Sequence, residues 1–564
     1  MILKSFVFVI CLLLLRISVS AQTPAWHWAK AGLPDRGGVD PRGVSTDAAG
    51  NVYATGASIA LTNFTFGNIV LPPNTMFLVK YNKKGKLIWA KNQSINCFPK
   101  AISTDAAGNT YITGEFRQTV VFGTTSLVCN GARDIFVAKF DSAGNVLWAR
   151  RAGGPGIPNA SPPVYVEDAG TAIAVDSAGN CYIGGLFEIS NFPNSNYNYV
   201  TFDTLTYSLP ASMNTNKAFG FLAKYNAGGQ IQWMRRIEAA KAEEAVKDIA
   251  ISRYGNIFVT GTLYNSLGFN NLPTLTSNGS DDIYFAKFAP NGAPVWSRSF
   301  GGTGVEVPNA IAVDDQEQCY LTGYFHSQNL PIGAFNLTGS QQQGTVFIVK
   351  SNSSGNIAWA AQNTGSGSIG DSDIALDLAG NVFVSASFTG TVNIGSQTHG
   401  ASNVTSGSLL VSKWSNTGSP LWAVTPQGKG VINRIAVDQI TGECYLSGVF
   451  DGTTTFGSHF VTANGTSSGL YIAKLSSQPT GIKEHFSSEL FVYPNPTQRE
   501  LHLNLSNTQG TFSAQLTDAT GKTVLTRKLL ASETTVALPK LPHGIYLLTV
   551  QTEKQVYRRK VVIQ

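Results

Sequence analysis

The chain contains little charge and little cysteine. Only 13% of its 564 residues are charged, and six are cysteines. Five of these follow residue 21, and none stands with histidine at the spacing of a zinc site. The sequence also lacks a His-Glu-x-x-His motif and an Asp-rich calcium loop. We therefore expect neither a metal nor a cofactor.

Motifs of known enzyme classes are nearly absent. Gly465–Gly469 fits a Gly-x-Ser-x-Gly elbow, but it lies in a connection with no helix to follow. Gly521 and the Lys-Thr pair after it lack the first glycine of a phosphate-binding loop. Basic residues form no patch in the first 480 residues, so we expect no nucleic-acid partner. No catalytic residue is predicted.

Long hydrophobic runs are absent after residue 21. Before it, Lys4, the apolar run from Phe6 to Leu15, and a small residue at Ala21 form the pattern of a secretory signal peptide. We expect residues 1–21 to be removed, which leaves no transmembrane segment. The alternative, an N-terminal membrane anchor, is disfavoured by the short run and by Arg16.

Repetition is what the sequence has in abundance. Variants of the segment 105–114, Asp-Ala-Ala-Gly-Asn-Thr-Tyr-Ile-Thr-Gly, begin at Asp47, Asp105, Asp176, Ser252, Asp314, Asp377 and Asp438. In the second copy, strands are predicted at 101–105, 110–114, 134–140 and 146–150, with tight Gly-Asn turns after the first and third. We interpret the recurrent aspartate as a residue that caps its turn.

A lysine recurs in the third strand and a tryptophan in the fourth. The lysines are Lys80, Lys139, Lys224, Lys287, Lys350, Lys413 and Lys474, and the tryptophans are Trp89, Trp148, Trp233, Trp296, Trp359 and Trp422. Residues repeated in every unit favour a structural pairing between neighbouring units. A ligand-binding ring of lysines is the alternative.

The tryptophan strands are one fewer than the lysine strands. The segment 26–30, Trp-His-Trp-Ala-Lys, matches the missing fourth strand and precedes every first strand. Four strands in about 60 residues are typical of a propeller blade. We predict an all-β chain with a seven-bladed β-propeller over residues 22–475, closed by an N-terminal strand. These motifs resemble the SBBP-type β-propeller repeats of exported bacterial proteins, a resemblance that covers about residues 26–475 and implies no single activity.

After a predicted linker at 476–487, the pattern changes. Residues 488–564 read as alternating strands, which predict a small Ig-like β-sandwich. The segment 493–496 (Tyr-Pro-Asn-Pro), the Gly-Lys turn at 521–522, the segment 541–546 (Leu-Pro-His-Gly-Ile-Tyr) and the basic end resemble the type A C-terminal sorting domain of the type IX secretion system. The resemblance implies recognition by that machinery and delivery to the outer cell surface or release.

Candidate binding residues come from the longest connection between predicted strands. Segment 188–217 places Phe192, Tyr197, Tyr199 and Tyr207 among Asn and Ser, a mixture that suits a glycan or surface protein. A longer hairpin with ordinary aromatic packing is the alternative. Cys97 and Cys129 lie in two connections of one repeat and are a candidate disulfide in an oxidising compartment.

The function expected from the sequence is therefore binding or scaffolding, without catalysis, outside the cell. The alternative is an extracellular glycan hydrolase or lyase. Paired carboxylates can come from separate repeats and leave no local spacing signal, so the sequence does not decide between the two.

Overall fold

The computed structural model describes residues 24–563 except 156–167, 190–198, 209–216, 240–245, 270, 403–406, 466, 480–489, 494–496, 506–510, 519–521, 531–534 and 553–555. The predicted signal peptide lies outside the described residues. The chain divides into two compact parts, Met1–Pro479 and Thr480–Gln564, called here the repeat domain and the tail domain. Within the described residues the chain is all-β, and no helix is long and apolar enough to cross a membrane.

Groups of four antiparallel strands recur along the described part of the repeat domain, some of them within larger sheets, and we number them as units. Unit 1 contains β2 (Gly37–Thr46), β3 (Val52–Ala60), β6 (Thr75–Tyr81) and β7 (Leu87–Ile95). Unit 2 contains β8 (Cys97–Thr104), β9 (Thr110–Phe116), β12 (Asp134–Phe140) and β13 (Val146–Gly153). Unit 3 contains β14 (Ala169–Val175), β15 (Cys181–Ile189), β18 (Lys217–Tyr225) and β19 (Ile231–Ala239). Unit 4 contains β20 (Asp248–Ile251), β21 (Ile257–Gly268), β22 (Leu275–Phe288) and β23 (Pro294–Phe300).

The later units repeat the same order. Unit 5 contains β24 (Glu306–Val313), β25 (Cys319–Phe325), β28 (Thr345–Ser351) and β29 (Ile357–Gln362). Unit 6 contains β31 (Ile369–Leu376), β32 (Val382–Phe388), β35 (Ser408–Trp414) and β36 (Pro420–Val424). Unit 7 contains β37 (Gln427–Val437), β38 (Cys444–Phe456), β40 (Ser468–Pro479) and β1 (Pro24–Pro34).

The fourth strand of unit 7 comes from the other end of the chain. β1 pairs antiparallel with β40, with Trp28 opposite Lys474 and Ala31 opposite Tyr471. The far end of β40 also pairs, because Pro479 lies opposite Pro24. The linker predicted to begin at residue 476 is therefore wrong at its start, since residues 476–479 belong to a strand.

Short hairpins fill the connections between second and third strands. They are β4 (Phe64–Phe66) with β5 (Ile69–Leu71), β10 (Thr119–Phe122) with β11 (Thr125–Val128), β16 (Tyr199–Phe202) with β17 (Leu205–Ser208), β26 (Asn329–Ile332) with β27 (Phe335–Thr338), and β33 (Thr391–Ile394) with β34 (Gln397–Gly400). In unit 7, β39 (His459–Thr462) pairs with the end of β38, and in unit 4 the ends of β21 and β22 pair with each other. Several hairpins also pair with the preceding unit: β4 with β1, β16 with β13, and β33 with the two-residue strand β30 (Thr364–Gly365).

The recurrent aspartate caps its turn, as the sequence indicates. Oδ1 of Asp47 accepts backbone N–H bonds from Ala49 at 3.0 Å and from Asn51 at 2.9 Å. Its Oδ2 accepts the Asn51 side-chain amide and the Tyr53 hydroxyl. The same bonds recur at Asp105 and Asp176. The aspartate is thus occupied with its own turn and strand.

The repeated lysine and tryptophan join several units to the next by hydrogen bonds, although Lys413 pairs with Asp377 of its own unit. The Nζ of Lys80 donates to the carbonyl of Ser142, in the third-to-fourth strand turn of unit 2, at 3.0 Å, and Trp89 Nε1 donates to the same oxygen at 3.3 Å. Gly144 in that turn has φ +78°, and a Cβ added to it would lie 3.1 Å from the Trp89 ring. The glycine therefore gives the turn its left-handed residue and lets it lie flat on the indole.

The same contacts join the last unit to the first. Lys474 Nζ donates to the Lys83 carbonyl at 3.2 Å, and Trp28 Nε1 donates to it at 3.3 Å. Each repeated lysine also lies over the aromatic ring of the second strand of its own unit, as Lys474 does over Tyr445 at 5.4 Å. We call these contacts between neighbouring units the seams. The structural interpretation of the lysines is confirmed.

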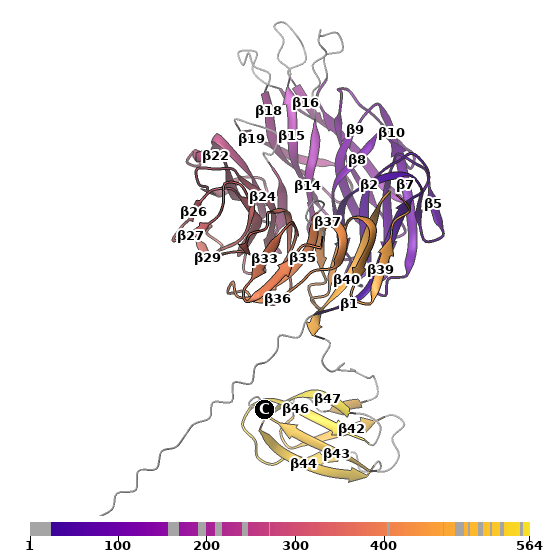
Figure 1. Cartoon of the computed structure of the whole chain (residues 1–564), viewed down its shortest axis with the longest axis vertical. Helices are drawn as coiled ribbons and strands as arrows, with labels where there is room; N and C mark the ends of the chain where they lie inside the picture. The colour runs from indigo at the N-terminus through magenta and orange to yellow at the C-terminus, as the bar shows by residue number, and fades with distance from the viewer. Residues whose placement is uncertain are drawn as a thin grey trace, which may run out of the picture. The chain divides into compact units, whose positions relative to one another are not determined.

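First strands meet around a common centre. Each contacts the first strand of the next unit, from β2 through β8, β14, β20, β24, β31 and β37, and β37 contacts β2. Figure 1 shows labelled first strands such as β14 and β37 toward the middle of the repeat domain, and hairpin strands such as β5 and β26 at its rim. Hydrophobic cores lie between neighbouring units; one combines Val52 and Phe77 of unit 1 with Tyr445 and Ile472 of unit 7. Each unit therefore buries its faces only with its neighbours.

The tail domain contains two antiparallel sheets. One has β41 (Leu490–Tyr493), β42 (Glu500–Leu505) and β45 (Thr535–Ala537); the other has β43 (Thr511–Thr517), β44 (Thr523–Leu530), β46 (Gly544–Gln551) and β47 (Val556–Ile563). Leu501 of the first sheet and Leu516 and Val550 of the second belong to one buried core. The tail is thus a separate small all-β body.

Candidate binding site

A polar pocket lies where the first strands meet. Its volume is about 150 Å³. It is lined by Pro41, Arg42, Lys247, Asn309, Asp371, Ser372 and Arg434. These residues come from units 1, 4, 5, 6 and 7, so the pocket belongs to the assembled domain and to no single unit. It is the candidate functional site.

Backbone bulges direct several of these side chains. Pairing between the first and second strands skips Arg42 in unit 1, Asn309 in unit 5 and Asp371 in unit 6. Units 2 and 3 skip Lys100 and Thr171 in the same way. A bulge leaves one residue outside the ladder and turns its side chain away from the sheet pattern. In units 1, 5 and 6 the skipped residue is one that lines the pocket.

The sequence alone did not lead us to this pocket, although each repeat carries a signal of it. The residue five positions before the turn residue is polar in every repeat, within an otherwise mostly apolar strand: Arg42, Lys100, Thr171, Lys247, Asn309, Ser372 and Asn433. Because these residues differ in kind, they do not stand out as a repeated letter. The repeated residues build the fold, while four of these varied residues, Arg42, Lys247, Asn309 and Ser372, line the pocket.

Two acids stand behind the pocket wall. Asp248 accepts the backbone N–H of Ile311 at 2.9 Å, and Asp373 accepts that of Ile435 at 2.7 Å. Each bond joins one first strand to the next unit. Burial, together with the negative charge of Asp373, raises the pKa of Asp248 to about 7, against the lowering effects of the Ile311 N–H bond and of Arg434. Burial also raises the pKa of Asp373, whereas Arg434 lowers it.

The remaining wall is a hydrogen-bonded group of neutral side chains. Asn309 Nδ2 donates to Ser372 Oγ at 3.2 Å, and Ser372 Oγ also lies 3.2 Å from Thr322 Oγ1. Arg42 is one of the charged residues in the lining, and its Nε donates to Asp40 Oδ2 at 2.9 Å. Asp40 does not line the pocket. Both arrangements hold pocket side chains in fixed positions.

The four aromatic residues predicted to bind a ligand do not form one described surface. Phe192 and Tyr197 lie outside the described residues. Tyr199 pairs with Ser208, and Val200 with Tyr207, in the hairpin β16–β17. Neighbouring residues of a strand point to opposite faces, so Tyr199 and Tyr207 face away from each other. Val200 is fully buried on the Tyr207 side.

Tyr207 packs within unit 3 and beside a groove. Its ring centroid is 6.3 Å from that of Phe187, and the Arg236 guanidinium lies 5.5 Å from its ring. A groove of about 230 Å³ includes Tyr207, Arg235, Arg236 and Phe269 in its lining. Arg235 is engaged there, since it donates to the Asn291 carbonyl at 2.9 Å.

The predicted disulfide is absent, which corrects that expectation. Cys97 and Cys129 are free thiols. Cys97 is buried with its Sγ 3.7 Å from Met76 Sδ, while Cys129 Sγ donates to the Gly131 carbonyl at 3.2 Å. Each sulfur is thus packed against a different neighbour. Among the described residues, no group of three or more His, Cys, Asp and Glu side chains could hold a metal ion.

Two further buried carboxylates, Asp134 and Asp282, hold the same position in different units and differ in whether a cation lies beside them. Asp134 begins the third strand of unit 2 and forms an ion pair with Arg151 at 2.7 Å. In unit 4, Asp282 holds the same register and Ser299 holds the position of Arg151. In this described segment Asp282 Oδ1 has no hydrogen-bond partner, and burial raises the pKa of Asp282 to about 6. These groups are buried in the sheet and reach no described pocket.

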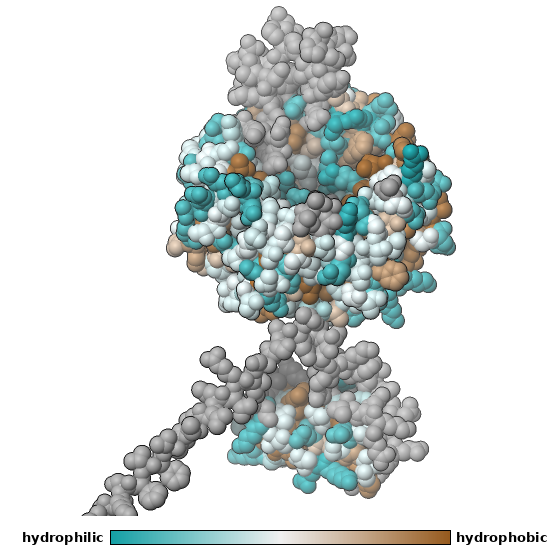
Figure 2. Space-filling model, viewed as in Figure 1, coloured by the Kyte–Doolittle hydropathy of each residue, from teal (hydrophilic) through white to brown (hydrophobic). Residues whose placement is uncertain are grey.

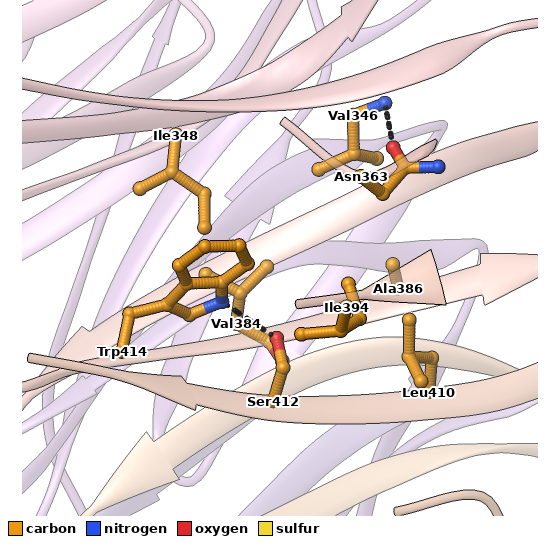
Figure 3. A pocket seen from close by; sticks show the side chains of 9 residues that line it. All are labelled: Val346, Ile348, Asn363, Val384, Ala386, Ile394, Leu410, Ser412 and Trp414. Carbon is orange, nitrogen blue, oxygen red and sulfur yellow. Dashed lines mark hydrogen bonds between the residues drawn. The ribbon is translucent and has the colours of Figure 1, made fainter. Parts of the chain in front are cut away.

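A small internal cavity in unit 6 is a packing defect. Figure 3 shows its lining, which includes Leu410, Ile394 and Trp414 with the Trp414–Ser412 hydrogen bond. Leu410 stands where the other units carry Phe or Tyr, so one ring is missing from the core. The cavity measures about 10 Å³, which is barely the space of one water molecule. It has no room for a ligand.

Comparisons with known proteins concern both the tail and the repeats. The secretion system C-terminal sorting domain family matches residues 491–564. An uncharacterized WD repeat-containing protein of Acanthamoeba polyphaga mimivirus is 24% identical over 482 residues, covering 72% of this chain. The chain spans only 33% of the length of that relative.

Solved structures are similar only at a distance. A quinohemoprotein alcohol dehydrogenase from Comamonas testosteroni has a TM-score of 0.36 and 10% identity, covering 85% of this chain and 80% of its own. A polysaccharide lyase of family PL25, an ulvan lyase, has a TM-score of 0.37 and 10% identity, covering 75% of this chain and 93% of its own. At TM-scores this low, neither likeness carries an argument about this chain. The tail match does: residues 491–564 form a secretion system C-terminal sorting domain, and the protein is exported by type IX secretion to the cell surface or the extracellular space.

Proposed function

We propose that this protein is an exported binding or scaffold module: a seven-bladed β-propeller closed by its N-terminal strand, with its ligand at the central pocket. The units are the blades. Support for closure comes from the cyclic contact of first strands, from the pairing of β1 with β40, and from the shared acceptor of Trp28 and Lys474 on unit 1. The tail domain, which we propose to be an Ig-like sandwich over residues 488–564, is the part that the secretion machinery recognises.

The observation that carries the binding role is the pocket itself. Side chains from five units converge there, three of them cationic, and buried hydrogen bonds hold them. A pocket of polar groups on a rigid scaffold is the usual form of a recognition site. Figure 2 shows that much of the visible face of the repeat domain is hydrophilic, as suits a body that stays in solvent.

A non-catalytic role is favoured over glycan cleavage. Glycosidases use two carboxyl groups flanking the scissile bond. Among the described residues that line the pocket, Asp371 is the single carboxylate. Asp248 and Asp373 accept backbone N–H groups and serve the joints between units. The glycan or surface protein that occupies the pocket is open to experiment.

The test measures binding of the secreted chain to a glycan array and to cell-envelope fractions. We expect saturable binding that is lost in Arg42→Gln and kept in Lys84→Gln, an exposed lysine that gives the same change of charge. Binding that survives Arg42→Gln would place the ligand elsewhere, with the groove beside Tyr207 as the next site to change. Breakdown of a polysaccharide by the chain would replace the binding role with the enzymatic one.

A further inference from the structure

The charges of the central pocket are unevenly placed. Its lining contains three cationic side chains, Arg42, Lys247 and Arg434, and one acid, Asp371. The cations come from units 1, 4 and 7 and converge on one space. The acids that balance them, Asp40, Asp248 and Asp373, stand outside the lining. The space itself is thus bordered mainly by positive charge.

Those outer acids position the cations. Asp40 takes the Nε and one Nη2 donor of Arg42, and a guanidinium carries five N–H groups, so donors at Nη1 are directed elsewhere. Asp248 and Asp373 lie close enough to Arg434 for its charge to lower the pKa of both. Because burial is the main cause that raises the pKa of Asp248 to about 7, this acid carries less negative charge near neutral pH than an exposed carboxylate would. Arg42 and Arg434 therefore lie beside acids that stand outside the lining.

The size and neutral lining restrict the ligand further. One water molecule needs roughly 10–15 Å³ of such a space, so a pocket of 150 Å³ corresponds to about ten to fifteen waters. That is enough for one sugar residue. Asn309 and Ser372 offer amide and hydroxyl groups to sugar hydroxyls. Guanidinium groups bind carboxylate and sulfate with two parallel hydrogen bonds.

We propose that the central pocket binds a single anionic sugar residue, with its carboxylate or sulfate held by Arg42, Lys247 and Arg434 and its hydroxyls by Asn309 and Ser372. This inference rests on the proposed binding function and names the ligand class for the same pocket. Two of the ligand-binding residues, Arg42 and Asn309, are residues that the strand pairing skips.

The experiment is titration calorimetry on the full secreted chain with glucuronate, glucose 6-sulfate, glucose and inorganic sulfate as probes. We expect glucuronate or glucose 6-sulfate to bind at least about tenfold more tightly than glucose, because a charge-assisted hydrogen bond is worth about one decade or more in affinity. Inorganic sulfate alone binds more weakly than the charged sugars. Arg42→Gln and Lys247→Gln each weaken the charged sugars about tenfold, while Lys84→Gln leaves them unchanged. Tryptophan fluorescence during heating checks that each variant is folded.

Four outcomes overturn the inference. Equal affinity for glucose and glucuronate, lost in Arg42→Gln, removes the anionic class and leaves the pocket as the binding site. Equal affinity for sulfate and the charged sugars removes the sugar. If envelope fractions bind while no probe binds and the pocket variants behave like the unchanged chain, the pocket is not the site. If neither probes nor envelope fractions bind, the proposed function fails as well. Binding of envelope fractions therefore distinguishes failure of the sugar inference from failure of the proposed function.

Discussion

Replacing Asp248 by Asn tests the central joint between units. The carboxylate accepts the Ile311 N–H, and an amide oxygen at the same place can accept it too. The change therefore keeps the hydrogen bond and removes the charge. It also removes the repulsion between Asp248 and Asp373.

The magnitude follows from the displaced pKa. Asp248 has a pKa of about 7 in the folded chain, against roughly 4 for an unfolded aspartate. A group with a raised pKa in the folded state favours folding at low pH, and its contribution is lost as the pH rises from about 4 to about 7. Three units correspond to about 4 kcal/mol. Asp248 keeps part of its surface open to the centre, so we expect a loss of about 2–3 kcal/mol between pH 5 and pH 8.

The assay is urea unfolding followed by tryptophan fluorescence. All nine tryptophans lie between residues 26 and 422, so the signal reports on the repeat domain alone. Because other buried acids contribute to the pH dependence, the informative quantity is the difference between variant and unchanged chain. Asp248→Asn should be more stable than the unchanged chain at pH 8 and similar at pH 5. The exposed Asp315→Asn is the control and should change neither value.

A parallel pH dependence in the two chains would refute the reasoning. It would mean that Asp248 is ionised at its ordinary pKa, with the centre well hydrated. A variant that is less stable at both pH values would instead show that the charge of Asp248 is needed by Arg434. Either result would also change the charge assigned to the pocket.

Three further expectations follow from the seams, the buried acids and the tail. Gly229→Ala should destabilise the repeat domain by about 1–3 kcal/mol in the same urea assay, because Gly229 has φ +79° and an added Cβ would lie 2.5 Å from the Trp148 ring; Gly228→Ala, with no ring within 4 Å, is its control. Ser299→Arg should supply the cation that Asp282 lacks, raising stability at pH 8 by about 1 kcal/mol and making it less dependent on pH between 5 and 8, whereas Ser299→Gln should not. Deleting residues 491–564 should leave the repeat domain folded but retained in the periplasm, as fractionation and immunoblotting would show; continued surface delivery would contradict the role of the tail.

The sequence predicts the repeated framework well because a repeated residue reveals a repeated contact. The turn aspartates and the lysine and tryptophan seam follow from this, and so does the all-β class. The turn between β4 and β5 also leaves a signal in the sequence, the pair Phe66-Gly67. These features depend on local turn chemistry and on contacts with one neighbouring unit.

The centre could not be predicted in the same way. Arg42, Lys247 and Arg434 are far apart in sequence and become neighbours only when the units surround a common point. Arg42 lies at a bulge, which depends on strand pairing and leaves no fixed motif. The register of the hairpin, which the sequence also does not give, places Tyr199 and Tyr207 on opposite faces. The cysteines met different neighbours, although their positions allowed a pair.

The position of β1 has a consequence for engineering the chain. Residues 24–34 complete a sheet whose other three strands end at Pro479, so the two ends of the repeat domain already lie side by side at Pro24 and Pro479. A circularly permuted gene could therefore begin at β2 and carry β1 directly after a short loop from β40. In that gene every unit is continuous, and the ends move to the gap between β1 and β2. In the natural order β1 is synthesised before its partner strand β40. A repeat domain that ends before β40 therefore cannot complete unit 7.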